Sequence, residues 1–238
     1  MNTDCDIFIR SYYKDFAWLR YALCSIRRYC HGFSNVVLVT PKSSRQKLDW
    51  ARLAGDVTVT CPDYKDDYLG QQVTKLTADE LSEAEFICHV DSDCVFRRPT
   101  TPADLFEATR PVVLMTAYRE LDPHVPWQGI TERLLQRQVL YEFMRTPPYT
   151  FPRWIYRAFR EHVFALHGKS LEDYVLAQPH RGFSEFNALG AYAFLNHSDH
   201  FTWRDVGNDG SCEGPCRVFW SWAGIDETTK QEIETLLR

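Results

Sequence analysis

Short apolar runs and helical repeats alternate along the first half of the chain, which predicts strands and helices in turn. Five runs predict strands: Asp6–Ser11, Val36–Thr40, Asp56–Cys61, Glu85–Val90 and Pro111–Ala117. Between them, helical spacing of apolar residues predicts helices over Phe16–Tyr29, Ser43–Ala54 and Gln71–Leu81. This alternation is typical of an α/β domain, in which a Rossmann-like, mostly parallel central sheet is flanked by helices.

The alternation of predicted strands and helices ends after Ala117. Longer helices are predicted over Trp127–Phe143, Phe159–Leu166 and Ser184–Leu195, with Pro147, Pro148 and Pro152 interrupting the chain between the first two. Strand-like runs follow at Phe201–Val206 and Arg217–Trp222, before a polar helix over Asp226–Arg238. The length of 238 residues suits one α/β domain, and we interpret residues 1–238 as a single domain.

Two carboxylates follow the fourth predicted strand directly, in Asp91-Ser92-Asp93. Ending a buried strand in two acids is costly unless a positive charge binds there. Alternate residues of an extended segment share a face, so Asp91 and Asp93 can approach one Mg²⁺ or Mn²⁺ ion, with diphosphate oxygens completing its shell. The alternative is that Asp91 only caps a turn.

Five short motifs appear in order along the chain. They are Ser11-Tyr12 with Asp15, Gln71-Gln72 with Lys75-Leu76, Asp91-Ser92-Asp93, Ser184-Glu185-Phe186 before Gly190, and Trp220-Ser221-Trp222. In these motifs the chain resembles the nucleotide-sugar glycosyltransferases of the GT-A fold, and within them a little-characterised bacterial and phage group. That resemblance implies a nucleotide-sugar donor, with UDP-sugar first, bound by residues 1–117, and an acceptor bound by residues 118–238.

The resemblance also implies roles for single residues on the donor side. Ser11 and Tyr12 would hold the nucleotide, Gln72 and Lys75 would lie near the donor, and Asp91 with Ser92 would bind its diphosphate together with the metal. Physical alternatives stay open, because Gln72 and Lys75 also suit a solvated helix face. Trp220 and Trp222 suit either a wall against a ligand or core packing.

Transfer of a sugar requires the acceptor hydroxyl to lose a proton, and a carboxylate is the usual base in inverting enzymes. Glu185 is the first candidate, because it follows Ser184 at a predicted helix start between two phenylalanines that would desolvate it. A first-turn glutamate favoured by the helix dipole is the competing interpretation. Asp173 is the second candidate.

Two histidines follow the apolar run that ends at Leu195. His197 and His200 could supply a further metal ligand, since neutral imidazole binds Mn²⁺. Packing of both rings within the structure is the alternative.

Basic residues gather between Thr131 and Ser170, although the whole chain has a net charge of −5. This segment contains seven basic residues and three acidic ones, and aromatic residues are interspersed among the basic ones. Arg153, Trp154 and Arg157 are therefore candidates for binding the acceptor. Such a surface suits DNA, which would make a 5-hydroxymethylpyrimidine in phage DNA one candidate acceptor. A polysaccharide or lipid-linked acceptor is the alternative, and in that case the arginines form solvated ion pairs.

Several other classes are less consistent with the sequence. A nucleotidyltransferase would carry a glycine-rich loop near the first strand, and residues 9–15 contain no glycine. A non-catalytic nucleotide-sugar-binding protein would not need both aspartates. Cys212 and Cys216 lack a second Cys/His pair at zinc spacing. The sequence shows no secretory leader and no apolar run of bilayer length, so a cytoplasmic location is expected.

Overall fold

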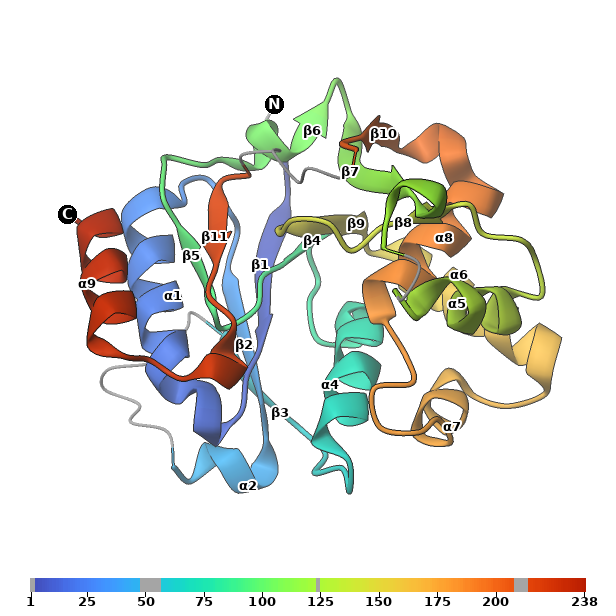
Figure 1. Ribbon diagram of the computed structural model, residues 1–238, viewed down its shortest axis with the longest axis horizontal. Coiled ribbons are helices and arrows are strands. Elements are labelled where there is room, and N and C mark those ends of the chain that lie inside the picture. Colours follow the sequence, from blue (N-terminus) through green and yellow to red (C-terminus); the bar gives the residue numbers. More distant parts are fainter. Residues whose placement is uncertain (1–2, 48–56, 123–124, 208–213) are drawn as a thin grey trace.

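The computed structural model describes residues 3–47, 57–122, 125–207 and 214–238, and it has the predicted α/β architecture (Figure 1). The central sheet has the order β3-β2-β1-β4-β9. Its strands are β1 (Cys5–Arg10), β2 (Val36–Pro41), β3 (Val57–Cys61), β4 (Phe86–His89) and β9 (Tyr149–Pro152). The first four run parallel, and β9 pairs antiparallel with β4.

The strand order reverses between β1 and β4, because β2 and β3 extend the sheet on one side of β1 and β4 pairs on the other. In sheets of this kind, ligands bind beyond the carboxyl ends of the strands at the reversal. In this protein those ends are Arg10, where β1 stops, and His89, where β4 stops.

Helices cover both faces of the sheet because its strands are apolar on both faces. Ile7 and Ile9 of β1 pack with Leu19 and Leu23 of α1 (Phe16–Tyr29). Phe8, which points to the opposite face, packs in the larger core. This second face is covered by α4 (Asp67–Leu76), α6 (Trp154–His167) and α8 (Glu185–His197). The C-terminal helix α9 (Glu227–Leu236) lies beside α1 (Figure 1).

The remaining strands form two smaller sheets. β7 (Arg110–Ala117) pairs with β6 (Phe106–Glu107), β8 (Tyr141–Glu142) and β10 (Thr202–Asp205), while β5 (Cys94–Phe96) pairs with β11 (Cys216–Val218). The fifth predicted strand therefore exists, but it lies outside the central sheet. The remaining helices are α2 (Lys42–Arg45), α5 (Trp127–Leu135) and α7 (Leu171–Leu176).

Several predicted boundaries are wrong. The helix predicted over Trp127–Phe143 ends at Leu135, because Gln136 is left-handed at φ 51° and the chain then enters β8. Helix α6 begins at Trp154, earlier than predicted. The last predicted strand ends at Val218, and a 3₁₀ turn covers Ser221–Ala223. Most of the helix predicted over 43–54 lies outside the described residues, as does Cys212.

The two halves of the chain share one core rather than folding apart. β9 of the second half completes the central sheet beside β4, and the larger core joins residues from Phe8 to Phe201. Helix α8 approaches Phe143 so closely that a Cβ on Gly190 would lie 2.6 Å from the Phe143 Cβ, so only glycine fits. Within the described residues, no helix is both long and apolar enough to cross a bilayer.

Candidate functional site

A cleft of about 1220 Å³ opens at the carboxyl ends of β1 and β4, where the strand order reverses. It is lined by the loop after β1, one face of α4, the turn after β4, the start of α8 and the segment Trp220–Trp222. Single small-molecule sites span roughly 300–1,000 Å³. The cleft is therefore large enough for two substrates side by side.

Lys75 lies at the centre of this site and joins two carboxylates. Its Nζ is 2.7 Å from Asp91 Oδ1 and 2.7 Å from Glu185 Oε1. The lysine is 4% exposed and Glu185 is equally buried. Burial by itself would lower the pKa of Lys75, but the two carboxylates offset it and raise this pKa above its ordinary value. The end of β4, α4 and α8 are thus linked by one buried cation.

The Asp91-Ser92-Asp93 turn presents both carboxylates to the cleft. Asp93 Oδ2 accepts a hydrogen bond of 2.9 Å from the Ser221 N–H, so this aspartate also anchors the C-terminal segment. Burial and the neighbouring Asp91 raise the pKa of Asp93. The predicted approach of Asp91 and Asp93 to one point is compatible with this turn.

The two aspartates fit a cation that is shared with a phosphorylated ligand. Mg²⁺ is characteristically held by one or two carboxylates, with substrate phosphates and water completing its shell. Among the described residues, no group of three or more His, Cys, Asp or Glu gathers to hold a metal. A closed, all-protein metal site therefore does not fit this part of the chain, whereas a two-carboxylate site does.

The end of β1 and the start of α4 contribute a second charged pair. Arg10 is 3% exposed and forms a bidentate ion pair with Asp67 at the start of α4. Tyr12 and Asp15 also line the cleft, and burial, with a smaller effect from Asp93, raises the pKa of Asp15 to about 6. Ser11 is not a lining residue of the cleft; it is 1% exposed, and its N–H donates to Val39 O.

One face of α4 carries Tyr68, Gln72 and Lys75 into the cleft. Gln72 is 1% exposed, which excludes the exposed-helix interpretation. The Oε1 atom of Gln72 has no hydrogen-bond partner within the described residues. A buried carbonyl oxygen without a donor is costly, so this atom suits a ligand that brings an O–H or N–H group.

Trp220 and Trp222 are rim residues and not core residues. They are 64% and 79% exposed, and both line the cleft on either side of Ser221. Since Ser221 is bound to Asp93, the two indole rings are held beside the aspartate turn. Ser92, which is 6% exposed, completes the same region.

Two features of the cleft were missed from the sequence. The Arg10–Asp67 pair joins residues 57 apart and has no local signal. Glu142, 4% exposed in β8, lines the cleft and accepts a 3.2 Å hydrogen bond from Asn187 of α8. Only the apolar surroundings of Glu142 in the sequence could have indicated its burial.

Three predicted site residues lie outside the cleft lining. Ser170 caps α7, and Asp173 lies in the first turn of that helix, where its N–H donates to Ser170 Oγ at 3.0 Å, so Asp173 is not placed to act as a base in the cleft. His197 and His200 pack edge-on against Trp154, with centroid distances of 5.0 and 5.2 Å. Neither histidine is therefore placed to share a cation with Asp91.

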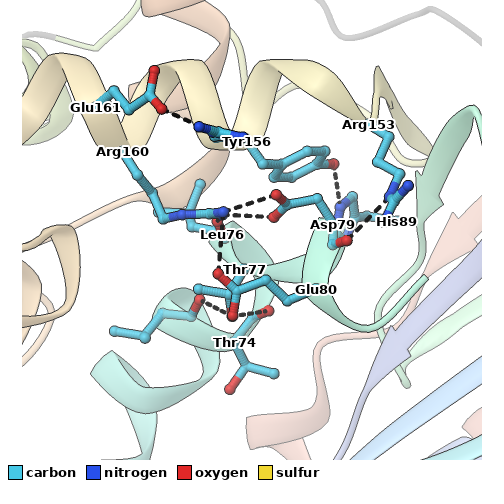
Figure 2. Close-up of polar contacts among 12 residues, drawn as sticks. Thr74, Leu76, Thr77, Asp79, Glu80, His89, Arg153, Tyr156, Arg160 and Glu161 are labelled. Carbon is cyan, nitrogen blue, oxygen red and sulfur yellow. Dashed lines mark hydrogen bonds and ion pairs between the residues drawn. The ribbon is translucent and has the colours of Figure 1, made fainter. Parts of the chain in front are cut away.

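The predicted acceptor-binding arginines, Arg153 and Arg157, are not lining residues of the cleft, and both are engaged in ion pairs. Figure 2 shows Arg153 together with the neighbouring Arg160. Arg153 contacts Asp79 O and Glu83, and Arg157 pairs with Glu161 at 2.8 Å. Arg160 reaches Asp79 with both terminal nitrogens, at 2.6 and 2.8 Å. The alternative of solvated or partly buried ion pairs is thus the one that the structure supports.

Comparison with known proteins adds a family and distant structural neighbours. Residues 59–204 match the model of a family of unknown function, DUF6492. This stretch contains Lys75, Asp91, Glu142 and Glu185. A search of the curated proteins finds no match. Among solved structures, 4-diphosphocytidyl-2C-methyl-D-erythritol synthase from Anaerococcus prevotii DSM 20548 is 12% identical, with a TM-score of 0.48 over 99% of this chain and 95% of that chain.

Proposed function

This chain belongs to the DUF6492 family, a family of unknown function, and we propose from its cleft that it is a glycosyltransferase of the GT-A kind. The proposed reaction moves a sugar from a nucleotide-sugar, with UDP-sugar as the first candidate, to an acceptor hydroxyl. A divalent cation, Mn²⁺ or Mg²⁺, would assist it. The observation that carries the proposal is the pair Asp91 and Asp93 at the end of β4, beside a buried lysine and an unpartnered amide oxygen.

The charge balance of the cleft supports a requirement for a cation. Seven carboxylates line it: Asp15, Asp66, Asp67, Asp91, Asp93, Glu142 and Glu185. Five permanent cations line it: Arg10, Lys14, Lys65, Lys75 and Arg181. A diphosphate would enter a site with surplus negative charge, so a divalent cation on Asp91 and Asp93 would offset the repulsion and, when bound, stabilise the leaving diphosphate.

The donor is proposed to lie along the end of the sheet. Tyr12 offers an aromatic face to the base, and Lys14 and Lys65 are further cations of the lining. Gln72 Oε1 would accept a hydrogen bond from a sugar hydroxyl, a group that a bare phosphate lacks. Trp220 and Trp222 would then cover the donor from the rim.

Glu185 is proposed to receive the proton. In an inverting mechanism, the acceptor oxygen forms a bond to the anomeric carbon while the bond between that carbon and the phosphate oxygen breaks. The nucleoside diphosphate leaves with the electron pair, and the hydroxyl proton passes to the Glu185 carboxylate. Lys75 holds Oε1 of this carboxylate and thereby fixes its orientation.

A thermal-shift screen of nucleotide-sugars, with and without Mn²⁺, tests the proposal. Ligand at a hundredfold excess over its Kd stabilises the folded state by about 2.7 kcal/mol. The expected result is a shift that needs both nucleotide-sugar and Mn²⁺, together with slow hydrolysis of the donor to free sugar and nucleoside diphosphate. The matched variant Glu185→Gln should keep the shift and lose transfer. Release of pyrophosphate from a nucleoside triphosphate would point to nucleotidyl transfer and would refute the proposal.

A further inference from the structure

The second half of the chain gives the cleft a wall with little positive charge. Five residues form this acceptor wall: Trp127, Glu142, Met144, Leu176 and Gln178. They comprise an indole, two apolar side chains, an amide and a carboxylate, and none of them is a cation. A surface of this kind packs on the apolar face of a sugar ring and hydrogen-bonds to hydroxyl groups.

Glu142 is the charged member of the acceptor wall, and the fold holds it in place. Its Oε1 accepts hydrogen bonds from Met144 N at 3.1 Å and from Asn187 Nδ2 at 3.2 Å. Asn187 is fully buried and also donates to Ser184 Oγ at 3.0 Å, next to Glu185. Arg145 pairs with the other oxygen of Glu142 at 3.3 Å, so that arginine is engaged with this carboxylate.

The cations that a polyanion would need are engaged elsewhere. Arg153, Arg157 and Arg160 pair with acids away from the cleft (Figure 2). Of the basic residues that the second half contributes to the lining, His180 lies 2.9 Å from Asp66, and Arg181 is exposed at the rim. On the side of the cleft formed by the second half, this one arginine is too little for DNA, since binding DNA requires several phosphates to be neutralised at once.

We infer that the acceptor is an uncharged saccharide whose reacting hydroxyl is received between Glu142 and Glu185. The inference rests on the proposed function and specifies its second substrate. Glu142 accepts a hydrogen bond from an acceptor hydroxyl, Gln178 contacts another, and Trp127 packs on the ring. The five residues of the acceptor wall offer a phosphate group no cation, so the wall does not favour nucleic acid or phosphorylated acceptors.

The test measures acceptor contact separately from donor chemistry. Saturation-transfer NMR on the full chain, with diamagnetic Mg²⁺ and nucleoside diphosphate present, uses a panel of uncharged disaccharides and methyl glycosides. The comparison probes are single-stranded DNA that contains 5-hydroxymethylpyrimidine and vesicles of anionic phospholipid. The Gln178→Ala variant is compared with Gln231→Ala, a matched change of an exposed glutamine on α9.

We expect a saccharide signal that is unchanged between about 50 and about 200 mM salt. Over the same range of salt, the affinity of a polyanion with six to ten phosphate contacts would fall by a factor of about 10³–10⁵. Gln178→Ala should weaken the saccharide about three- to tenfold, the loss of one neutral hydrogen bond, and Gln231→Ala should not. Salt-sensitive binding of DNA or vesicles in the cleft would overturn the inference, as would the absence of any saccharide signal. Saccharide binding without any binding or hydrolysis of nucleotide-sugars would instead refute the proposed function and leave the saccharide site standing.

Discussion

Replacing Lys75 by methionine should destabilise the protein strongly, because it leaves two carboxylates without their shared cation. Lys75 is 4% exposed, and it is held by Asp91 and Glu185, each at 2.7 Å. Removing one partner from a buried ion pair costs about 3–5 kcal/mol, because the remaining charge stays desolvated. The Asp91 side chain is 31% exposed and water can reach it. We therefore expect a loss near the lower end, about 3 kcal/mol.

Urea denaturation measures this loss directly. For a chain of this size, each 1 kcal/mol lowers Tm by about 2–4 °C, so Lys75→Met should melt about 6–12 °C lower. Lys230→Met is the matched control. Lys230 lies 3.8 Å from Glu227 on the exposed face of α9. Its loss should change the free energy of unfolding by less than about 0.5 kcal/mol.

Manganese separates a charge effect from a packing effect. A divalent ion on Asp91 and Asp93 would supply positive charge where the lysine is missing, so Mn²⁺ should stabilise Lys75→Met more than the unsubstituted protein. If Lys75→Met lowers the free energy of unfolding by less than about 1 kcal/mol, with an unchanged urea m-value, then Lys75 is not the shared cation of the two carboxylates in solution. A large loss that Mn²⁺ does not reduce would show that packing dominates.

Three further predictions test other contacts in the structure. Arg160→Met should lower the free energy of unfolding by about 1–3 kcal/mol, because it removes the bidentate pair with Asp79. Arg157→Met breaks an exposed i,i+4 pair and should lower it by less than about 0.5 kcal/mol. Urea denaturation measures both. Burial holds the pKa of His89 well below 6.5, so below that pH the unfolded chain binds a proton that the folded chain does not. As the pH falls below 6.5, the free energy of unfolding of the unsubstituted protein should therefore decrease relative to that of His89→Gln. The decrease should reach up to about 1.4 kcal/mol per pH unit. Asp91→Asn should abolish the part of the nucleotide-sugar thermal shift that depends on Mn²⁺, and an undiminished shift would remove Asp91 from the metal site.

The elements that the sequence predicted well are those whose apolar pattern is decided locally. Helix α1 has the predicted bounds, Phe16–Tyr29, because a single apolar stripe packs on one face of the sheet. The strands up to β4 were recognised because continuous apolar runs suit strands buried on both faces. The aspartate turn followed from chain order alone, since it comes directly after β4.

Pairing between distant segments could not be predicted in this way. Lys75 and Glu185 are 110 residues apart, and only the packing of α8 against α4 brings them together. The helix predicted to reach Phe143 is interrupted because two residues of β8 pair with β7, with Glu142 opposite Thr116. Local periodicity contains no information about that partner strand.

The basic segment at residues 131–170 shows that a local count of charges cannot predict ion pairs either. A count over residues 131–170 finds seven basic residues and three acidic ones, which indicated a surface for a polyanion. Asp79, Glu80 and Glu83 lie far outside this window, and yet they receive Arg160 and Arg153 across α6. Composition within a window cannot count acids that the fold supplies from elsewhere.

The buried lysine also bears on how the site exists before any ligand binds. A buried ion network is a weak source of stability, because apolar residues of similar volume often serve as well. Stability alone therefore gives no reason for a lysine at position 75. Without it, however, Asp91 and Glu185 would repel each other at the edge of the sheet and would favour displacement. Lys75 holds both carboxylates in place, so an incoming cation and an incoming hydroxyl would meet preformed partners, and little binding energy would be needed to assemble the site.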